Sequence, residues 1–262
     1  MFPAGIRAQG DLLLYPKRIV FDGSKRSQTL NVANTGKDSV RYFISVLQIR
    51  MNDDGSFQTI TQPDSAQFFA DKNFRFFPRT VFLGPNESQT VKMQLVNTGQ
   101  LAAGEYRSHL YFRAEAEKQP LGAEPPNNDT SAIAVKLVAV FGISIPVIIR
   151  IGETNSIVDF SDLSFQMVRD TMPELKITFN RSGNASIYGD ISVDHISNQG
   201  KVTRIGIVKG MALYTPNKLR HFNLPLDKNP SVDYHSGKLH LVYTTQPDAS
   251  SRKIAETELV LH

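Results

Sequence analysis

The side chains that proteins use for catalysis, among them six histidines, form no catalytic pattern in this 262-residue chain. The absence of cysteine excludes thiol nucleophiles, disulfides and cysteine-ligated metals. The sequence also lacks a Gly-x-Ser-x-Gly nucleophile turn, a phosphate-binding glycine loop and a His-Glu-x-x-His zinc motif. We therefore predict a protein that is not an enzyme, with no catalytic residues and no cofactor.

Two groups of polar side chains invite comparison with metal sites. His235 and His240 are five residues apart, so on one strand they would face opposite sides of the sheet. Asp53-Asp54-Gly55 resembles the start of a calcium loop, but the later ligands and the closing glutamate are missing from the sequence. We expect surface histidines, a hairpin turn and no metal site.

The most unusual feature is an apolar segment over residues 132–150, preceded by a loop-like stretch over 115–131. It is much longer than a typical strand of about five or six residues. Its odd positions form an unbroken apolar row: Ile133, Val135, Leu137, Ala139, Phe141, Ile143, Ile145 and Val147. We expect a buried central strand from Ile143 to Ile149. On the N-terminal side of Ile143, the apolar row is longer than the core of its own domain needs. This excess predicts an exposed strand edge that pairs with a partner's strand.

The elements that must position this segment are β-strands. Short alternating or β-branched runs are separated by Gly, Asn and Pro turns, and no window keeps a 3.6-residue period over three turns. Strands at this spacing are typical of β-sandwiches or β-barrels, so we predict an all-β protein. The strands expected are 11–21, 28–34, 40–51, 80–83, 89–96, 105–114, 132–150, 175–180, 187–197, 202–208, 221–226, 238–244 and 255–261.

A weak internal repeat divides the chain. In each half a strand, a glycine turn and a second apolar strand follow one another, at 29–46 and at 174–193. The predicted domains are residues 11–150 and 151–262, with the boundary where the longest strand ends at a glycine. Residues 1–10 have two interpretations: the remnant of a signal peptide, whose charged start and apolar core are missing, or an ordinary terminus.

A second structural motif is Ala102-x-Gly104-x-Tyr106-x-Ser108, which has the spacing of the immunoglobulin tyrosine corner. In that motif the tyrosine hydroxyl bonds to the backbone a few residues upstream. We expect Tyr106 to have a structural role.

The charge distribution narrows the classes of partner. The net charge is +4, and residues 1–150 carry all of the excess, with 17 basic and 13 acidic side chains. Because no Lys/Arg run concentrates this charge, we expect no nucleic-acid binding. Lys136 interrupts the segment over residues 132–150, so no uninterrupted apolar stretch reaches 18 residues and we expect no membrane insertion.

Several motifs in a fixed order resemble the periplasmic pilus-assembly chaperones, the PapD-like family. They are Tyr15–Gly23, Leu30-x-Val32-x-Asn34-Thr-Gly36, Phe77–Val91, Arg107–Phe112 and the long strand that ends at Arg150. The resemblance covers residues 11–150 well, while the second half fits by length and all-β character. It implies two immunoglobulin-like domains at an angle, a periplasmic location and a role in fimbrial fibre assembly without catalysis.

The resemblance also implies a binding mode and a set of site residues. The family donates its G1 strand to incomplete pilin-like secreted subunits, and it works with an outer-membrane usher. A self-capping dimer is a further partner to consider. The cleft arginine that grips the subunit's terminal carboxylate corresponds to Arg18, and the donor residues to Ile133, Val135, Leu137, Ala139 and Phe141. The alternative is a structural or adhesive immunoglobulin-like envelope protein with no assembly role.

Two departures from the family indicate a divergent member. The family's lysine on the G1 strand corresponds to Pro146 in this sequence. The family's interdomain carboxylate corresponds to Arg107, so Arg150, expected to be structural, needs another acidic partner. Glu105 and Glu153 are the two candidates.

Overall fold

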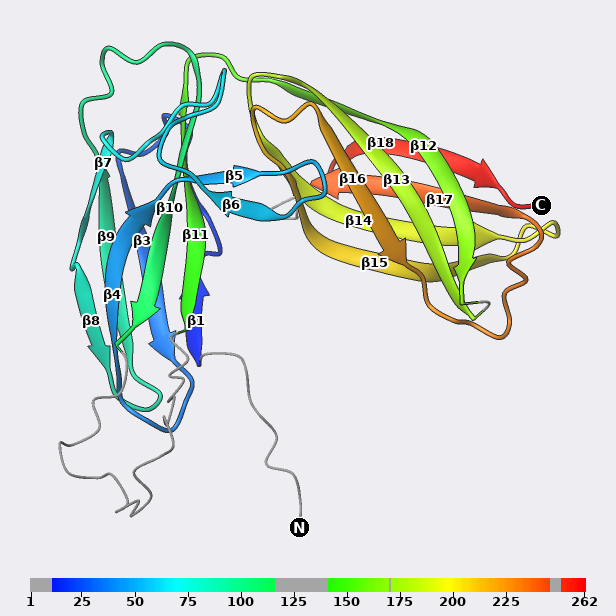
Figure 1. The fold of residues 1–262 in the computed structure, drawn as a ribbon, viewed down its shortest axis with the longest axis horizontal. Helices are drawn as coiled ribbons and strands as arrows, with labels where there is room; N and C mark the ends of the chain where they lie inside the picture. The colour runs from blue at the N-terminus through cyan, green and yellow to red at the C-terminus, as the bar shows by residue number, and fades with distance from the viewer. Residues whose placement is uncertain (1–10, 116–140, 170, 246–250) are drawn as a thin grey trace, which may run out of the picture. The chain divides into compact units, whose positions relative to one another are not determined.

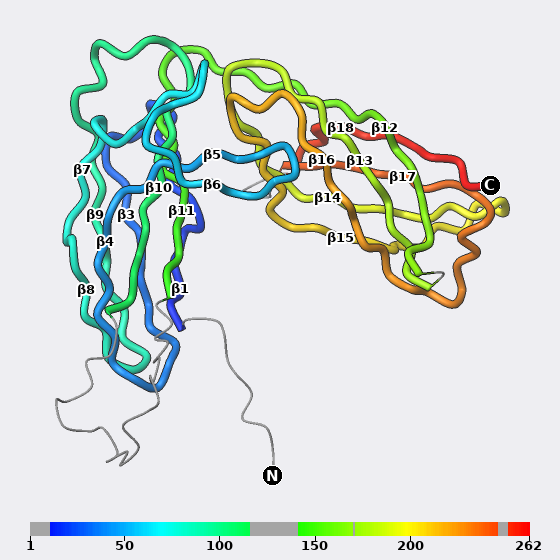
Figure 2. Tube along the Cα trace, viewed as in Figure 1, coloured from blue at the N-terminus to red at the C-terminus, as the bar shows by residue number. Residues whose placement is uncertain are grey.

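The computed structural model describes residues 11–115, 141–169, 171–245 and 251–262, and every regular element in these ranges is a β-strand. Figure 1 shows the strands as ribbons and Figure 2 follows the same path as a tube. Within the described ranges, no helix is long and apolar enough to cross a membrane.

The chain forms two compact units, and the second unit includes parts of the N-terminal half of the sequence. Unit 1 consists of residues 1–47, 69–100 and 107–149. Unit 2 consists of residues 48–68, 101–106 and 150–262. The longest continuous stretch of unit 2 therefore begins at Arg150, where the long apolar segment ends.

Unit 1 has two sheets, and the strands of the first alternate between buried and exposed residues. One sheet has the order β1 (Leu12–Tyr15), β3 (Ser27–Asn34), β9 (Ser88–Leu95) and β7 (Phe74–Phe77). The other has the order β2 (Ile19–Phe21), β11 (Gly142–Ile151), β10 (Gly104–Ala114), β4 (Val40–Leu47) and β8 (Thr80–Leu83). Both sheets contribute fully buried side chains, among them Leu30 and Val91 from the first and Phe21 and Phe112 from the second. This period of two is what a β-sandwich requires.

Unit 2 has a second pair of sheets. The strands of one are β12 (Ser156–Val168), β13 (Met172–Gly183) and β16 (Leu219–Pro225). The other contains β15 (Val202–Leu213), β14 (Ile187–Ile196), β17 (Lys238–Thr245) and β18 (Lys253–Val260). Leu175, Phe179, Ile191 and Tyr243 are at the centre of their shared core. A small hairpin of β5 (Ile49–Met51) and β6 (Phe57–Thr59) also belongs to this unit. The predicted all-β fold with two sandwiches is confirmed.

Some strand boundaries differ from the prediction. The expected strand 11–21 is two strands: β1 pairs with β3 in one sheet, and β2 pairs with β11 in the other. The expected strand 40–51 is likewise divided into β4 and β5. Three strands, β6, β7 and β12, have no counterpart in the prediction.

Candidate functional site

The first part of β11 has an open edge in the described structure. β11 lies between β10 and β2, but β2 pairs in parallel only with Val147, Ile148 and Ile149. Within the described part of the chain, no strand pairs on that side with residues 142–146. An unpaired strand edge of this kind is a template for a further strand.

The hydrogen bonding of Phe141 indicates which backbone groups face this edge. The carbonyl of Phe141 accepts a hydrogen bond from the Ala114 N–H at 3.0 Å, so it points toward β10. Backbone groups of successive strand residues point to alternate sides. The N–H and C=O groups of Gly142 and Ser144 therefore point to the side of β2, away from β10.

The apolar row of β11 emerges gradually from the core. Phe141 is 43% exposed and Ile143 is half-buried, whereas Ile145 is 4% exposed and Val147 and Ile149 are fully buried. The buried central strand expected from Ile143 to Ile149 is confirmed for its odd positions from Ile145 onward. The row thus leaves the core of its own unit at the open edge.

The other predicted donor residues are not part of the described structure. Ile133, Val135, Leu137 and Ala139 lie in residues 116–140, outside the described ranges. Phe141 is therefore the predicted donor residue whose surroundings the structure gives.

Arg18 lies beside the open edge. It is half-buried, is the last residue of the bend after β1 and comes directly before β2. Since Ile19 pairs with Val147 in a parallel register, Arg18 lies at the end of β2 where the pairing with β11 stops. The change of sheet between Tyr15 and Ile19 therefore brings a cation to the open edge. Pro146, where the family has a lysine, is half-buried in β11 and provides no charge.

The tyrosine corner is confirmed. Tyr106 is 8% exposed, and its hydroxyl donates to the carbonyl of Ala102 at 3.2 Å. Its ring also packs on Phe68, with 5.1 Å between the ring centroids. The residue links the start of β10 to the preceding loop.

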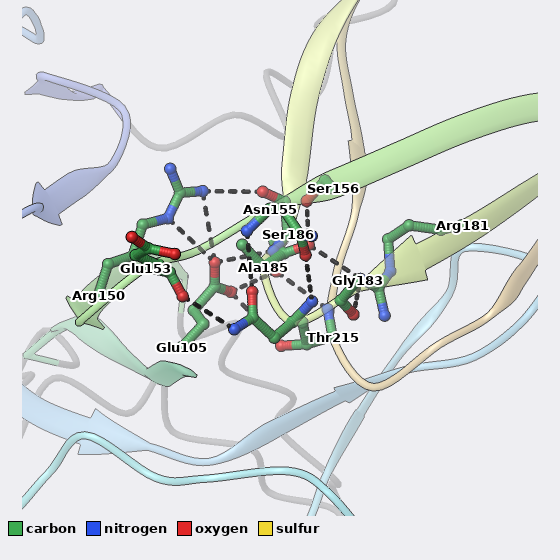
Figure 3. Close-up of polar contacts among 11 residues, drawn as sticks. Glu105, Arg150, Glu153, Asn155, Ser156, Arg181, Gly183, Ala185, Ser186 and Thr215 are labelled. Carbon is green, nitrogen blue, oxygen red and sulfur yellow. Dashed lines mark hydrogen bonds and ion pairs between the residues drawn. The ribbon is translucent and has the colours of Figure 1, made fainter. Parts of the chain in front are cut away.

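Arg150 belongs to a polar cluster in unit 2, which shows its acidic partner (Figure 3). Its guanidinium lies 3.4 Å from Oε2 of Glu105, whose side chain is fully buried, and it donates to the carbonyl of Ser186 at 2.8 Å. Glu105 also accepts the Ser186 N–H at 2.8 Å and the Ser186 hydroxyl. Of the two acidic candidates, Glu105 is the partner. Glu153 instead accepts a hydrogen bond through its backbone carbonyl, from Asn184.

Other members of this cluster had no signal in the sequence. Ser186 is 81 positions from Glu105, and Thr215, which lies 3.4 Å from the same carboxylate, is 110 positions away. Arg181 is buried and bonds to nearby backbone carbonyls. Contacts over such separations have no local motif, so only the folded chain identifies them.

The residues compared with metal sites lie in two turns and on one strand. Asp53-Asp54-Gly55 forms the turn between β5 and β6, as expected. The placement of both histidines on one strand is wrong, because His235 lies in the turn before β17 and only His240 lies on that strand. In the described ranges, no three His, Asp or Glu side chains are grouped so that they could hold a metal ion.

Comparisons with known proteins give similarity at the level of fold. No protein-family model and no curated protein matches the sequence. Among solved structures, the Pseudomonas aeruginosa CupB2 chaperone is similar with a TM-score of 0.45 and 14% identity, over 95% of this chain and 100% of that one. The CsuC-CsuE chaperone-tip adhesion subunit complex of Acinetobacter baumannii gives 0.45 and 11%, over 93% and 98% of the two chains. The Salmonella enterica SafA pilin in complex with the SafB chaperone gives 0.41 and 15%, over 97% of each. Chaperones of pilus assembly are thus among the solved structures to which this chain is similar.

Proposed function

We propose that the protein is a periplasmic chaperone that captures pilin-like secreted subunits by adding the strand that ends in β11 to an incomplete subunit fold. The observation that carries the proposal is the open edge of β11, where the apolar row passes from fully buried at Val147 to 43% exposed at Phe141. Such an edge supplies both ladder hydrogen bonds and side chains for a partner's groove.

Arg18 gives this site a defined end. A guanidinium beside the first paired residue of β2 is suited to a carboxylate, such as the C-terminus of a bound subunit. The donor residues in this proposal are Ile133, Val135, Leu137, Ala139 and Phe141. Each apolar side chain that becomes fully buried in a partner would contribute about 1.5–3 kcal/mol.

The proposal is tested by the proteins that co-purify with the tagged chain from the envelope fraction. Charged residues in the row, in the double variant Leu137→Glu/Phe141→Glu, should remove captured subunits because a carboxylate cannot be buried in an apolar groove. Ile207→Glu, at a residue of β15 that is 57% exposed, is the matched control and should leave capture intact.

Two results would contradict the proposal. Unchanged capture of subunits by the double variant would exclude the apolar row as the binding element. Recovery of a chain that carries no secreted subunit at all, with mature surface proteins in its place, would favour a structural or adhesive envelope protein. The melting temperature of each variant is the control that distinguishes a loss of capture from a loss of fold.

A further inference from the structure

A pocket of about 440 Å³ lies within unit 2. Its volume is in the range of about 300–1,000 Å³ that is common for small-molecule sites. Ala66, Phe68, Ala103 and Pro216 contribute apolar surface to its wall. A mostly apolar wall with a few polar groups is the usual composition of a site for an organic ligand.

One of the polar groups that line the pocket is the buried guanidinium of Arg181. Arg181 is 6% exposed, and its Nε donates to the carbonyl of Asn217 at 2.8 Å. Its Nη1 donates to the carbonyls of Gly183 and Ala185, at 3.0 and 2.9 Å (Figure 3). In the described structure, its Nη2 donates to no protein group. All acceptors of this cation are therefore neutral carbonyls, and the N–H groups of Nη2 remain available to a ligand.

The charges around the pocket do not balance. Glu105 is its acidic lining residue, but that carboxylate is already held by Arg150 and Ser186. Neither Arg181 nor the exposed Lys218 at the rim forms an ion pair with a described residue. Burial lowers the pKa of Arg181, and the charge of Glu105 opposes this only in part. Because a guanidinium stays protonated, a buried positive charge remains without a matching anion.

We propose that this pocket binds a small organic carboxylate. Its carboxylate would lie between Nη2 of Arg181 and the amine of Lys218, and its apolar group would lie against Phe68 and Pro216. The lining favours such a monoanion over a phosphate because it offers mainly apolar surface and few donors. This site is separate from the residues of the proposed function, so either can fail without the other.

The test is a titration of the full chain with 4-fluorobenzoate, followed by fluorine NMR of the ligand. We expect saturable binding with a dissociation constant on the order of millimolar. The uncharged 4-fluorobenzamide should bind at least about tenfold more weakly, because it cannot form the charge-assisted hydrogen bonds. Equal binding of the two compounds, or no saturation with 4-fluorobenzoate, would overturn the proposal.

Two variants locate the binding without disturbing Arg181, whose bonds to three carbonyls are structural. Ala103→Leu fills part of the pocket and should abolish binding, and Lys218→Met should weaken it several-fold. Lys209→Met, which removes a lysine outside the pocket, is the control and should bind as the wild type does. If Ala103→Leu does not fold, Lys218→Met decides the matter. Wild-type binding by Lys218→Met, or a loss of binding in Arg18→Ala, would place the anion elsewhere.

Discussion

The carboxylate of Glu105 and the guanidinium of Arg150 meet at 3.4 Å, although 45 positions of sequence separate them. Glu105 is fully buried, whereas the side chain of Arg150 is 31% exposed. Glu105 also receives two hydrogen bonds from Ser186. One carboxylate near the start of β10 therefore holds the end of β11 and a loop of unit 2 together.

Removal of this carboxylate should destabilise the fold. In Glu105→Ala, the Ser186 N–H and hydroxyl lose a buried acceptor, while Arg150 keeps some contact with water. We expect the free energy of unfolding to fall by about 2–4 kcal/mol, less than for a fully buried pair because solvent screens Arg150. Urea unfolding measures this change. Glu258→Ala, which breaks the exposed pair with Lys238, is the control and should change little. Equal effects of the two variants would contradict the structural role of Glu105.

His109 should make the stability depend on pH. It is 4% exposed on β10, and burial, with a smaller contribution from the charge of Arg107, lowers its pKa to about 3. Because an unfolded histidine has a pKa of about 6.5, the unfolded chain binds more protons than the folded chain between these values. Its contribution is therefore complete above pH 6.5 and decreases as the pH falls toward 3.

The expected loss from this histidine between pH 7.5 and pH 4.5 is about 2–3 kcal/mol in the free energy of unfolding. Urea unfolding at a series of pH values measures it. His109→Gln should flatten the profile in this range, whereas His235→Gln, in an exposed turn, should leave it unchanged. If His109→Gln keeps the slope of the wild type, other groups account for the pH dependence.

The tyrosine corner should contribute a modest amount to stability. Tyr106→Phe removes the hydroxyl that donates to Ala102 and leaves the ring against Phe68. The expected loss is about 1 kcal/mol, as for a typical hydrogen bond to a neutral acceptor. Thermal or urea unfolding detects this change. Tyr15→Phe, at a residue that is 70% exposed, serves as the comparison and should be neutral.

Arg18 should affect binding more than folding. If a subunit carboxylate is bound at this end of β2, Arg18→Ala removes a charge-assisted contact of about 1.5–3 kcal/mol. The affinity for a captured subunit should then fall about tenfold to a hundredfold in a binding titration. Lys17→Ala removes an exposed neighbouring charge and is the matched control. Wild-type affinity in Arg18→Ala would exclude this residue from the site.

Local alternation predicts a strand well as long as its register is uniform. β12 had no such signal because Asp162 has a φ of 50° and the register with β13 shifts between Ser161 and Ser164. The inward apolar residues therefore change from even positions, Val158 and Phe160, to odd positions, Leu163 and Phe165. A bulge of this kind divides one strand into two short patterns, neither of which is long enough to recognise.

The two strands of the predicted segment 11–21 illustrate a different limit. The apolar pattern there was correct, but it contained no information on which sheet each part joins. The same holds for the candidate site: the apolar row was readable because it is local, whereas the choice between Glu105 and Glu153 depended on Ser186, far away in sequence. Local periodicity predicts whether a residue is buried, but it does not predict which distant strand or side chain that residue contacts.

Pro146 limits how far β2 can pair along β11. Alternation along β11 directs the backbone nitrogen of residue 146 toward β2, and proline has no hydrogen to donate there. β2 therefore cannot continue its ladder by that bond, and pairing begins only at Val147. Under the proposed function, this proline would therefore help to keep the backbone of β11 before Val147 available to a partner's strand. A residue with an N–H at this position could donate to β2. The pairing of β2 with β11 would then extend further, and fewer residues of β11 would be available to a partner's strand.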